Sequence, residues 1–146
     1  MGWLHSERET AAAELEAIYA EVERLARQLA EHAQRAPYPH VEERLRELHV
    51  EQERTAEEVA VKLAELGRRA SPDGRPTRGG RNAWERLAAT IEDYRRLINR
   101  LAQLEIRWED ERPEDALFLH RLRRQASAHR DALADLLARS DPHAID

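Results

Sequence analysis

Cysteine is absent from the 146 residues of this chain, and Lys62 is its only lysine. A chain without cysteine has neither a disulfide framework nor a thiolate-ligated zinc site. Because nearly all of the positive charge is arginine, we infer a GC-rich bacterial genome as its source.

Long apolar runs are also missing. No segment approaches the roughly 20 apolar residues of a membrane-spanning helix, and residues 1–7 lack the apolar core of a signal peptide. We therefore expect a cytoplasmic protein without a membrane partner. The net charge of −5 argues against nucleic-acid binding, which needs a clustered basic surface. Neither a Gly-rich phosphate loop after a strand nor a nucleophile motif is present, so no motif indicates an enzyme.

Charged residues make up 36% of the chain and hydrophobic residues 41%, a balance that suits long helices around an apolar core. Apolar residues recur with 3-4-3-4 spacing in four stretches, which can be buried only by packing against one another. We therefore predict an all-α four-helix bundle in a single domain, residues 1–146. The four stripes are Leu15, Ile18, Val22, Leu25 and Leu29; Val41, Leu45, Leu48, Val59, Leu63 and Leu66; Trp84, Leu87, Ile91, Tyr94, Ile98, Leu101 and Trp108; and Leu119, Leu122, Ala126, Leu133 and Leu136.

Capping and proline signals mark where each helix begins. Ser6 opens a capping-box pattern, and Asn82 opens a second one. Pro39 and Pro113 fit the first turn of a helix, where a missing N–H costs nothing. These signals predict helices over residues 6–36, 39–69, 82–110 and 113–139.

The connections between these helices differ in length. The short breaks around Pro37 and Arg112 predict two antiparallel helical hairpins. Residues 70–81 form a flexible loop between the hairpins. Fully extended, residues 69–81 would reach about 43–47 Å, close to the length of a helix of about 30 residues. The loop can therefore either turn back locally or cross the length of the bundle.

Several polar residues interrupt the apolar stripes, although an unpaired buried polar group costs roughly 1–3 kcal/mol. Gln52 and Thr55 follow the first hairpin turn by nearly the same numbers of residues as Ala126 and His129 follow the second. The interrupting residues are His32, Gln52, Thr55, Glu105 and His129.

Two residue pairs, Gln52 with Thr55 and Ala126 with His129, resemble the metal-binding motif of ferritin-like di-iron proteins of the rubrerythrin and bacterioferritin type. In that family, the second and fourth helices each carry a Glu and a His three residues apart, and both side chains point at one metal pair. Gln52 and Ala126 stand at the Glu positions, Thr55 stands at one His position, and His129 retains the other. The resemblance implies a ferritin-like bundle.

The substitutions at these positions remove most of the metal ligands. A di-iron centre needs several carboxylates to neutralise two hard cations, together with imidazoles. The carboxylates that the family carries on its first and third helices would fall near Val22 and between Tyr94 and Ile98, where the stripes are apolar. We therefore predict neither a di-iron centre nor another cofactor.

A metal site remains as the alternative. If the 70–81 loop turns back, His32, Glu105 and His120 fall near the same end of the bundle and can together hold iron or zinc. Otherwise, they form a polar bundle end in which Glu105 pairs with an arginine.

His129 is a further metal-ligand candidate. Its other interpretation is a core histidine that hydrogen-bonds Gln52, Thr55 or Tyr94, because buried polar groups normally find partners within the protein.

Two features point to binding partners. Trp3 precedes the predicted cap of the first helix and would be exposed in a monomer, and tryptophan is enriched at interfaces, so we expect a homo-oligomer, most simply a dimer. The loop arginines either bind an acidic partner or nucleic acid or belong to a solvated linker; no aromatic residue alternates with them as single-strand binding would require. These arginines are Arg69, Arg75, Arg78 and Arg81.

The leading interpretation is a non-enzymatic helical module that binds a protein partner or itself. The alternative is a metal-binding ferritin-like protein, for storage or as an oxidoreductase, that uses His129 or the group of His32, Glu105 and His120. A third interpretation is a small-ligand site in a cavity beside Ala126.

Overall fold

The computed structural model describes the backbone of residues 2–140 and the side chains of residues 7–140. Within this part of the chain there are four α-helices and no strand: α1 (Gly2–Gln34), α2 (Pro39–Glu65), α3 (Ala83–Glu111) and α4 (Pro113–Ala138). The predicted all-α class with four helices is confirmed. None of the described helices combines the length and the apolar character that crossing a bilayer requires.

Three of the four predicted helix starts agree with the structure to within one residue. α2 begins at Pro39 and α4 at Pro113, each with its proline in the first turn. The Asn82 side chain accepts a hydrogen bond of 2.8 Å from the Glu85 amide and so caps α3.

The predicted start at Ser6 and the predicted end at residue 69 are wrong. α1 begins at Gly2, because residues 3–6 contain neither Pro nor Gly to stop the helix. α2 ends at Glu65, because Gly67 adopts a φ of 82° and the Arg68 amide bonds the Leu63 carbonyl at 2.9 Å. The expectation for the Trp3 side chain lies outside the described residues.

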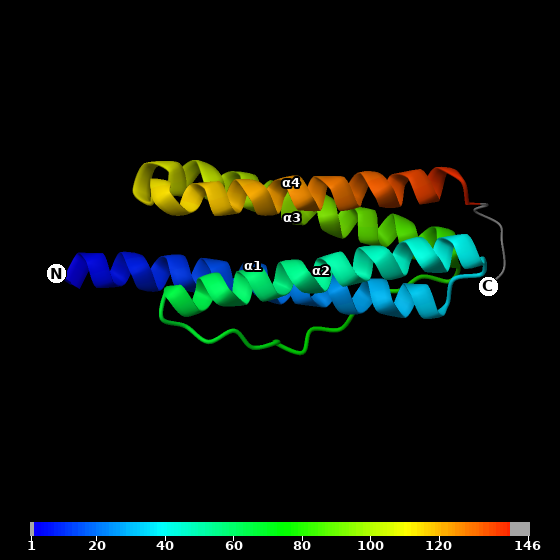
Figure 1. Cartoon of the computed structure of the whole chain (residues 1–146), viewed down its shortest axis with the longest axis horizontal. Coiled ribbons are helices and arrows are strands. Elements are labelled where there is room, and N and C mark those ends of the chain that lie inside the picture. The colour runs from blue at the N-terminus through cyan, green and yellow to red at the C-terminus, as the bar shows by residue number, and fades with distance from the viewer. Residues whose placement is uncertain (1, 141–146) are drawn as a thin grey trace.

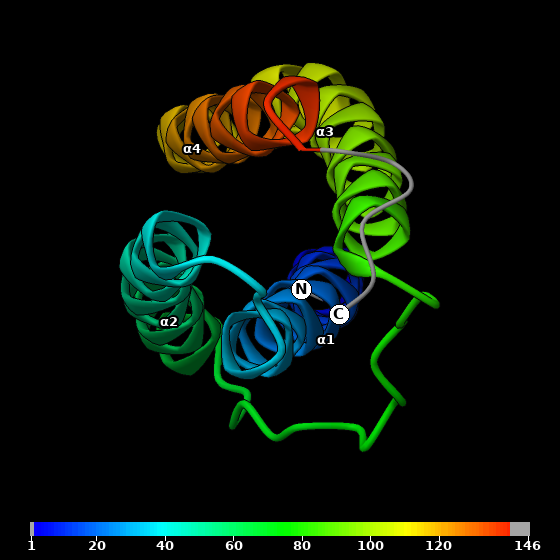
Figure 2. The same ribbon diagram turned by 90° about the vertical axis from the view of Figure 1, so that its right-hand side faces the viewer.

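The helices form two closely packed pairs, α1 with α2 and α3 with α4, which meet mainly where α1 contacts α3. In Figure 1, α2 returns beside α1, and α4 returns beside α3. The core between them contains the fully buried Trp108, Tyr94, Leu15 and Leu25. Figure 2 shows that α2 and α4 lie on the side where the ring of helices is most open. The contact between these two helices is the smallest of the four.

The connection between α2 and α3 crosses the length of the bundle (Figure 1), and it passes around the outside of α1 (Figure 2). At its start, Arg8 Nη2 on α1 donates to the Glu65 carbonyl at 2.7 Å. Further along, the Arg27 guanidinium donates to the Arg75 carbonyl at 2.9 Å, and the Arg78 amide donates to Gln28 Oε1 at 2.7 Å. The loop therefore follows α1 and does not turn back.

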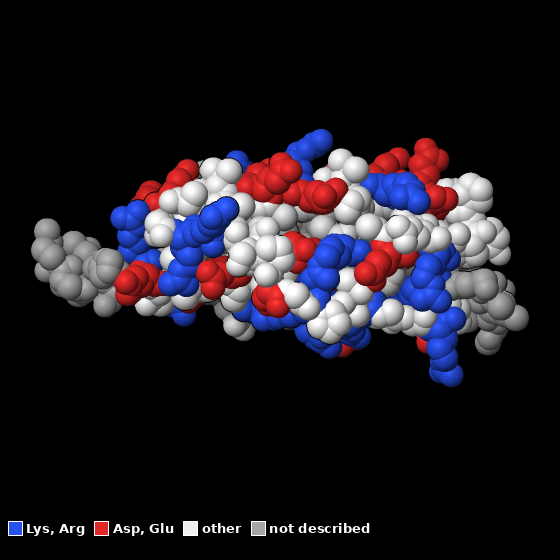
Figure 3. Space-filling view, turned by 90° about the horizontal axis from the view of Figure 1, so that it is seen from below, with Lys and Arg blue, Asp and Glu red and all other residues white. Residues whose placement is uncertain are grey.

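The loop arginines are partly neutralised by the chain's own carboxylates. Arg75 pairs with Asp73 at 2.7 Å, and Arg78 pairs with Asp93 at 2.5 Å. Figure 3 shows basic and acidic side chains interspersed over the face that it displays. This face therefore lacks the continuous basic surface that nucleic-acid binding needs.

Asp93 explains why the loop is held against the helices. Its side chain is only 1% exposed, and a buried carboxylate needs compensating charge. Besides Arg78, its neighbours are Arg24 and Arg96, each at 3.5 Å, and Gln28 Nε2, which donates at 3.0 Å. Arg78 makes the shortest of these contacts and belongs to the crossing loop, so the loop completes the neutralisation of a helix residue.

We expect Arg78→Ala to lower the free energy of unfolding by about 2 kcal/mol. This is less than the roughly 3–5 kcal/mol typical of a broken buried ion pair, because Arg24 and Arg96 remain near Asp93. Urea denaturation measures the loss. Arg81→Ala is the matched control, since the Arg81 side chain is 92% exposed and its loss should cost almost nothing. Equal losses in the two variants would contradict this account of Asp93.

Candidate functional site: the polar centre and the α2–α4 groove

Gln52, on α2, connects all four helices through its side-chain amide. Its Nε2 donates to the Val22 carbonyl of α1 at 3.2 Å. Its Oε1 accepts from the Tyr94 hydroxyl of α3 at 2.8 Å and lies 2.9 Å from His129 Nδ1 of α4. A residue that interrupts the apolar pattern is therefore the centre of a hydrogen-bond network.

This network fixes where the protons lie. The Val22 carbonyl can only accept, so it orients the Gln52 amide with Oε1 toward His129. His129 Nδ1 must therefore carry a hydrogen in order to donate to that oxygen. His129 Nε2 faces Glu51 Oε2 at 3.0 Å, and a hydrogen bond there requires a further proton on the imidazole or on the carboxyl group.

Burial governs the ionisation of the network. It lowers the pKa of His129, while the hydrogen bond and charge of Glu51 oppose that shift. Burial also raises the pKa of Tyr94 well above its ordinary value, and the Glu51 charge adds to the effect. Tyr94 therefore remains a neutral donor at physiological pH.

All four positions that resemble the ferritin motif face inward. Gln52 is 2% exposed, Thr55 7%, Ala126 4% and His129 5%. The interpretation of His129 as a core histidine bonded to Gln52 or Tyr94 is confirmed. The Thr55 hydroxyl instead lies 3.1 Å from both the Glu51 carbonyl and Gln125 Oε1.

The centre offers little to a metal ion. Across the part of the chain that the structure describes, no group of three or more His, Asp or Glu side chains is arranged to hold one. The two ring nitrogens of His129 face Gln52 and Glu51, and among the described residues Glu51 alone offers this ring a carboxylate. Ligation of a metal by His129 thus stays a prediction.

The prediction that His32, Glu105 and His120 share one metal site is wrong. His32 Nε2 bonds the Thr90 hydroxyl on α3 at 2.9 Å. Glu105 lies on the same helix, and a separation of 15 residues along a helix corresponds to about 22 Å. The crossing loop removes the condition under which the three residues would meet.

Glu105 instead belongs to a separate polar cluster between α3 and α4. It accepts from Arg123 Nε at 2.7 Å, and its Oε1 lies 2.8 Å from His120 Nδ1. The hydrogen bonds from Arg123 and His120 lower the pKa of Glu105 despite its burial. The expectation that Glu105 pairs with an arginine is confirmed.

A second buried network lies between α1 and α3. The Thr90 hydroxyl donates to the Arg86 carbonyl at 3.0 Å and accepts from Gln28 Nε2 at 2.8 Å. Its remaining lone pair accepts from His32, whose Nε2 therefore carries a hydrogen. This network continues through Gln28 to Asp93 at 3.0 Å.

Sequence reasoning missed this second network. Gln28, Thr90 and Asp93 lie directly beside apolar stripe residues, where a polar side chain at helical spacing usually faces solvent. The available signal was the pair Leu97 and Leu104, two apolar residues beside the predicted stripe, whose burial shows that α3 buries a second face.

Besides the buried pair of Gln52 with His129, four polar pairs of the described residues span the seam between α2 and α4. Along the seam these are Glu51 with His129 at 3.0 Å, Thr55 with Gln125 at 3.1 Å, Glu58 with Arg121 at 3.9 Å and Lys62 with Asp115 at 2.5 Å. This seam is also the smallest of the four helix contacts.

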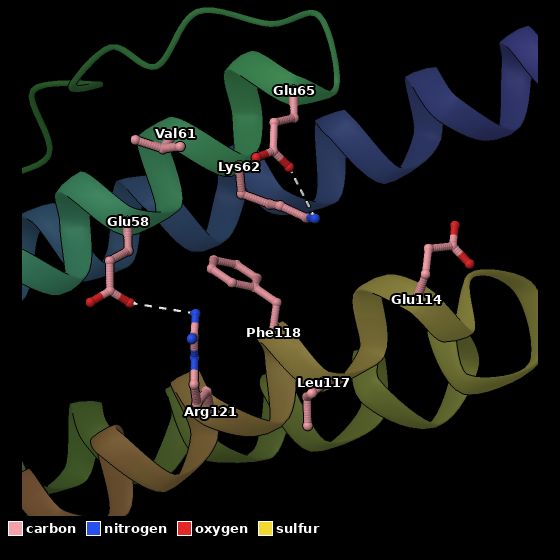
Figure 4. Close-up of a pocket in the computed structure, with 8 residues that line it drawn as sticks. All are labelled: Glu58, Val61, Lys62, Glu65, Glu114, Leu117, Phe118 and Arg121. Atoms are coloured by element: carbon pink, nitrogen blue, oxygen red, sulfur yellow. Dashed lines mark ion pairs between the residues drawn. The ribbon is translucent and has the colours of Figure 1, made fainter.

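A surface groove of about 430 Å³ lies on this seam (Figure 4). Its walls include Val61 of α2 and Leu117 of α4, which are 62% and 71% exposed. The Phe118 ring lies between Lys62 and Arg121, with each cation within 6 Å of its centroid: Lys62 Nζ at 5.9 Å and the Arg121 guanidinium at 5.8 Å. The groove is thus apolar with charged edges.

Comparisons with protein-family models, with curated proteins and with solved structures gave no match. The chemistry of the polar centre and of the α2–α4 groove therefore carries the functional argument.

We expect Tyr94→Phe to lower the free energy of unfolding by about 1 kcal/mol, the usual net value of a hydrogen bond. The substitution removes the hydroxyl that donates to Gln52 Oε1 but leaves the ring in the core. Tyr38→Phe is the control, because Tyr38 is 48% exposed and should tolerate the change. A Tyr94→Phe variant as stable as the parent in chemical denaturation would count against the network.

Acid should weaken the fold through His32. Burial, together with the nearby Arg86 and Arg35 charges, lowers the pKa of His32 from 6.5 to about 4. As the pH falls below 6.5, the unfolded chain gains a proton on this ring that the folded protein excludes, so stability declines until about pH 4. That shift corresponds to about 3 kcal/mol.

The measurement compares His32→Gln with the parent by urea denaturation between pH 7 and pH 4. The introduced glutamine keeps an N–H donor for Thr90 but does not titrate. We expect the stability of the parent to fall by about 3 kcal/mol relative to the variant over this range. Parallel pH profiles would show that His32 titrates normally.

Proposed function

We propose that this chain is a non-enzymatic, ferritin-like four-helix bundle, built from two antiparallel hairpins, that acts as a protein-interaction or self-associating module without a di-iron centre. The observation that carries this proposal is the network around Gln52. Its amide, the Tyr94 hydroxyl and the His129 Nδ1 bond one another, and Gln52 and His129 are two of the positions that resemble the family's metal-ligand motif.

The ferritin-like relationship is supported by the crossing loop and by the inward-facing motif positions. Ferritin-like bundles contain one long crossover connection, and here residues 66–82 connect α2 to α3 along the length of the bundle. Gln52, at the Glu position of the first copy of the motif, and His129, at the His position of the second copy, bond each other at 2.9 Å.

The chemistry of the centre supports a module without a metal. Iron would require anionic oxygens, but Gln52 provides a neutral oxygen that already accepts two hydrogen bonds. Removing those bonds to free ligands would leave buried polar groups unpaired.

The surface supports a role in association, because the α2–α4 groove leaves Val61 and Leu117 exposed. A homodimer is the simplest assembly. A cytoplasmic location and a bacterial source belong to the same proposal, since a chain without cysteine is compatible with a reducing compartment.

Anaerobic loading with Fe²⁺, followed by desalting and metal analysis, tests the proposal. We expect far less than two equivalents of iron per chain, and the same trace amount in a His129→Gln variant. Two equivalents in the parent that disappear in His129→Gln would overturn the proposal and establish a metalloprotein. Zn²⁺ loading under the same conditions extends the test to the other metal that imidazole and carboxylate favour.

A further inference from the structure

We propose that the α2–α4 groove binds a second copy of this chain across a two-fold axis that runs parallel to the helices. The inference rests on the proposed function and narrows its partner to the chain itself. The groove, its charges and the size of the face each support this dimer.

The α2–α4 seam is the smallest of the four contacts between described helices. Two of its cross-helix pairs are ion pairs of different quality: Lys62 with Asp115 at 2.5 Å and Glu58 with Arg121 at 3.9 Å. The latter pair is at the limit of direct contact, and both side chains are exposed, at 37% and 63%. Glu58 and Arg121 are therefore available to an external partner.

The apolar residues of the groove are arranged as one patch. Val61 and Leu117 come from facing helices, and the half-buried Phe118 lies between the two walls (Figure 4). Single exposed apolar residues need no explanation, but grouped ones mark interaction sites. Ile106, on α3, is an example of the former, because it is 69% exposed and does not line this groove.

The charges beside the patch suit a second copy. Glu58 of α2 and Arg121 of α4 lie at the same level of the groove, on opposite walls (Figure 4). A two-fold axis parallel to the helices exchanges the walls and keeps the level. Glu58 of each copy then faces the partner's Arg121, and the apolar patch of each copy faces the patch of the other. Such an interface is self-complementary, as a two-fold dimer requires.

The face is large enough for a specific dimer. α2 has 27 residues and α4 has 26, so each is about 40 Å long. Two helices side by side are about 20 Å wide, which gives about 800 Å² per copy. A standard protein interface buries about that area on each partner. Leu117 and Phe118 lie within the patch, where anchor residues dominate binding.

The first experiment measures self-association by sedimentation equilibrium over a range of concentrations from about 1 µM to about 500 µM, which covers the weak end of the affinities found for interfaces of this size. We expect a monomer–dimer equilibrium. Leu117→Ser should weaken dimerisation at least tenfold. Ile106→Ser is the matched control, with a similar change of chemistry at a residue of similar exposure, and should leave the dissociation constant unchanged. Circular dichroism confirms that both variants remain folded.

The second experiment separates contacts between copies from contacts within one chain. Glu58→Arg and Arg121→Glu should each weaken the homodimer, because each places like charges across the two-fold axis. A mixture of the two variants should dimerise again. At one contact the introduced arginine of the first chain then faces the introduced glutamate of the second, and at the other contact the unchanged Arg121 faces the unchanged Glu58. No pair within a single chain is repaired by mixing.

A protein that stays monomeric throughout the concentration range would overturn the dimer, while the iron measurement would still decide the proposed function separately. A dimer that is equally insensitive to Leu117→Ser and Ile106→Ser, or that is not restored by mixing, would also overturn it, because another surface would then form the contact. Conversely, if the protein dimerises through this groove and also binds two irons per chain, the proposed interface stands and the proposed function without a di-iron centre is wrong.

Discussion

The side-chain amide of Gln52 is the constraint on which the arrangement of the four helices depends. Its two polar atoms bond Val22 of α1, Tyr94 of α3 and His129 of α4. Sliding any one of these helices by a turn would leave at least one of these buried atoms unpaired, at roughly 1–3 kcal/mol. Apolar stripes of leucine tolerate several registers, whereas this amide is satisfied in only one. The polar centre therefore selects the alignment that hydrophobic burial alone leaves open.

The route of the chain between α2 and α3 depends on a second buried polar group. Asp93 lies on α3 facing α1, and the arginine closest to it belongs to the crossing loop. Asp93 lies in the half of the bundle that is remote from the end of α2. A loop that turned back at the end of α2 would therefore not bring Arg78 to this carboxylate. The helix order and the burial of Asp93 therefore require each other: the crossing supplies the charge, and the charge holds the crossing against α1.

Periodicity and punctuation predicted the helices because both are local. Pro39, Pro113 and Asn82 act on the backbone beside them, so their positions in sequence were sufficient. The inward orientation of Gln52 and His129 followed from the same periodicity. The partners of Asp93 did not, because Arg24 and Arg78 are distant in sequence and approach it only through tertiary packing. The distance between His32 and Glu105 could likewise not be predicted from the sequence, because it depends on whether the 70–81 loop turns back or crosses the bundle.

The contact between α2 and α4 is small because most of the buried apolar residues pack in the other three helix contacts. α3 buries two faces, one against α4 and one against α1, and α1 buries two against α2 and α3, so the core closes around these three contacts. The contacts between α2 and α4 include partly exposed ion pairs such as Glu58 with Arg121, which contribute only about 0–1 kcal/mol each. Covering Val61 and Leu117 would gain about 25 cal/mol for each Å² of apolar surface removed from water. The α2–α4 face therefore has the most to gain from a partner among the seams of this bundle.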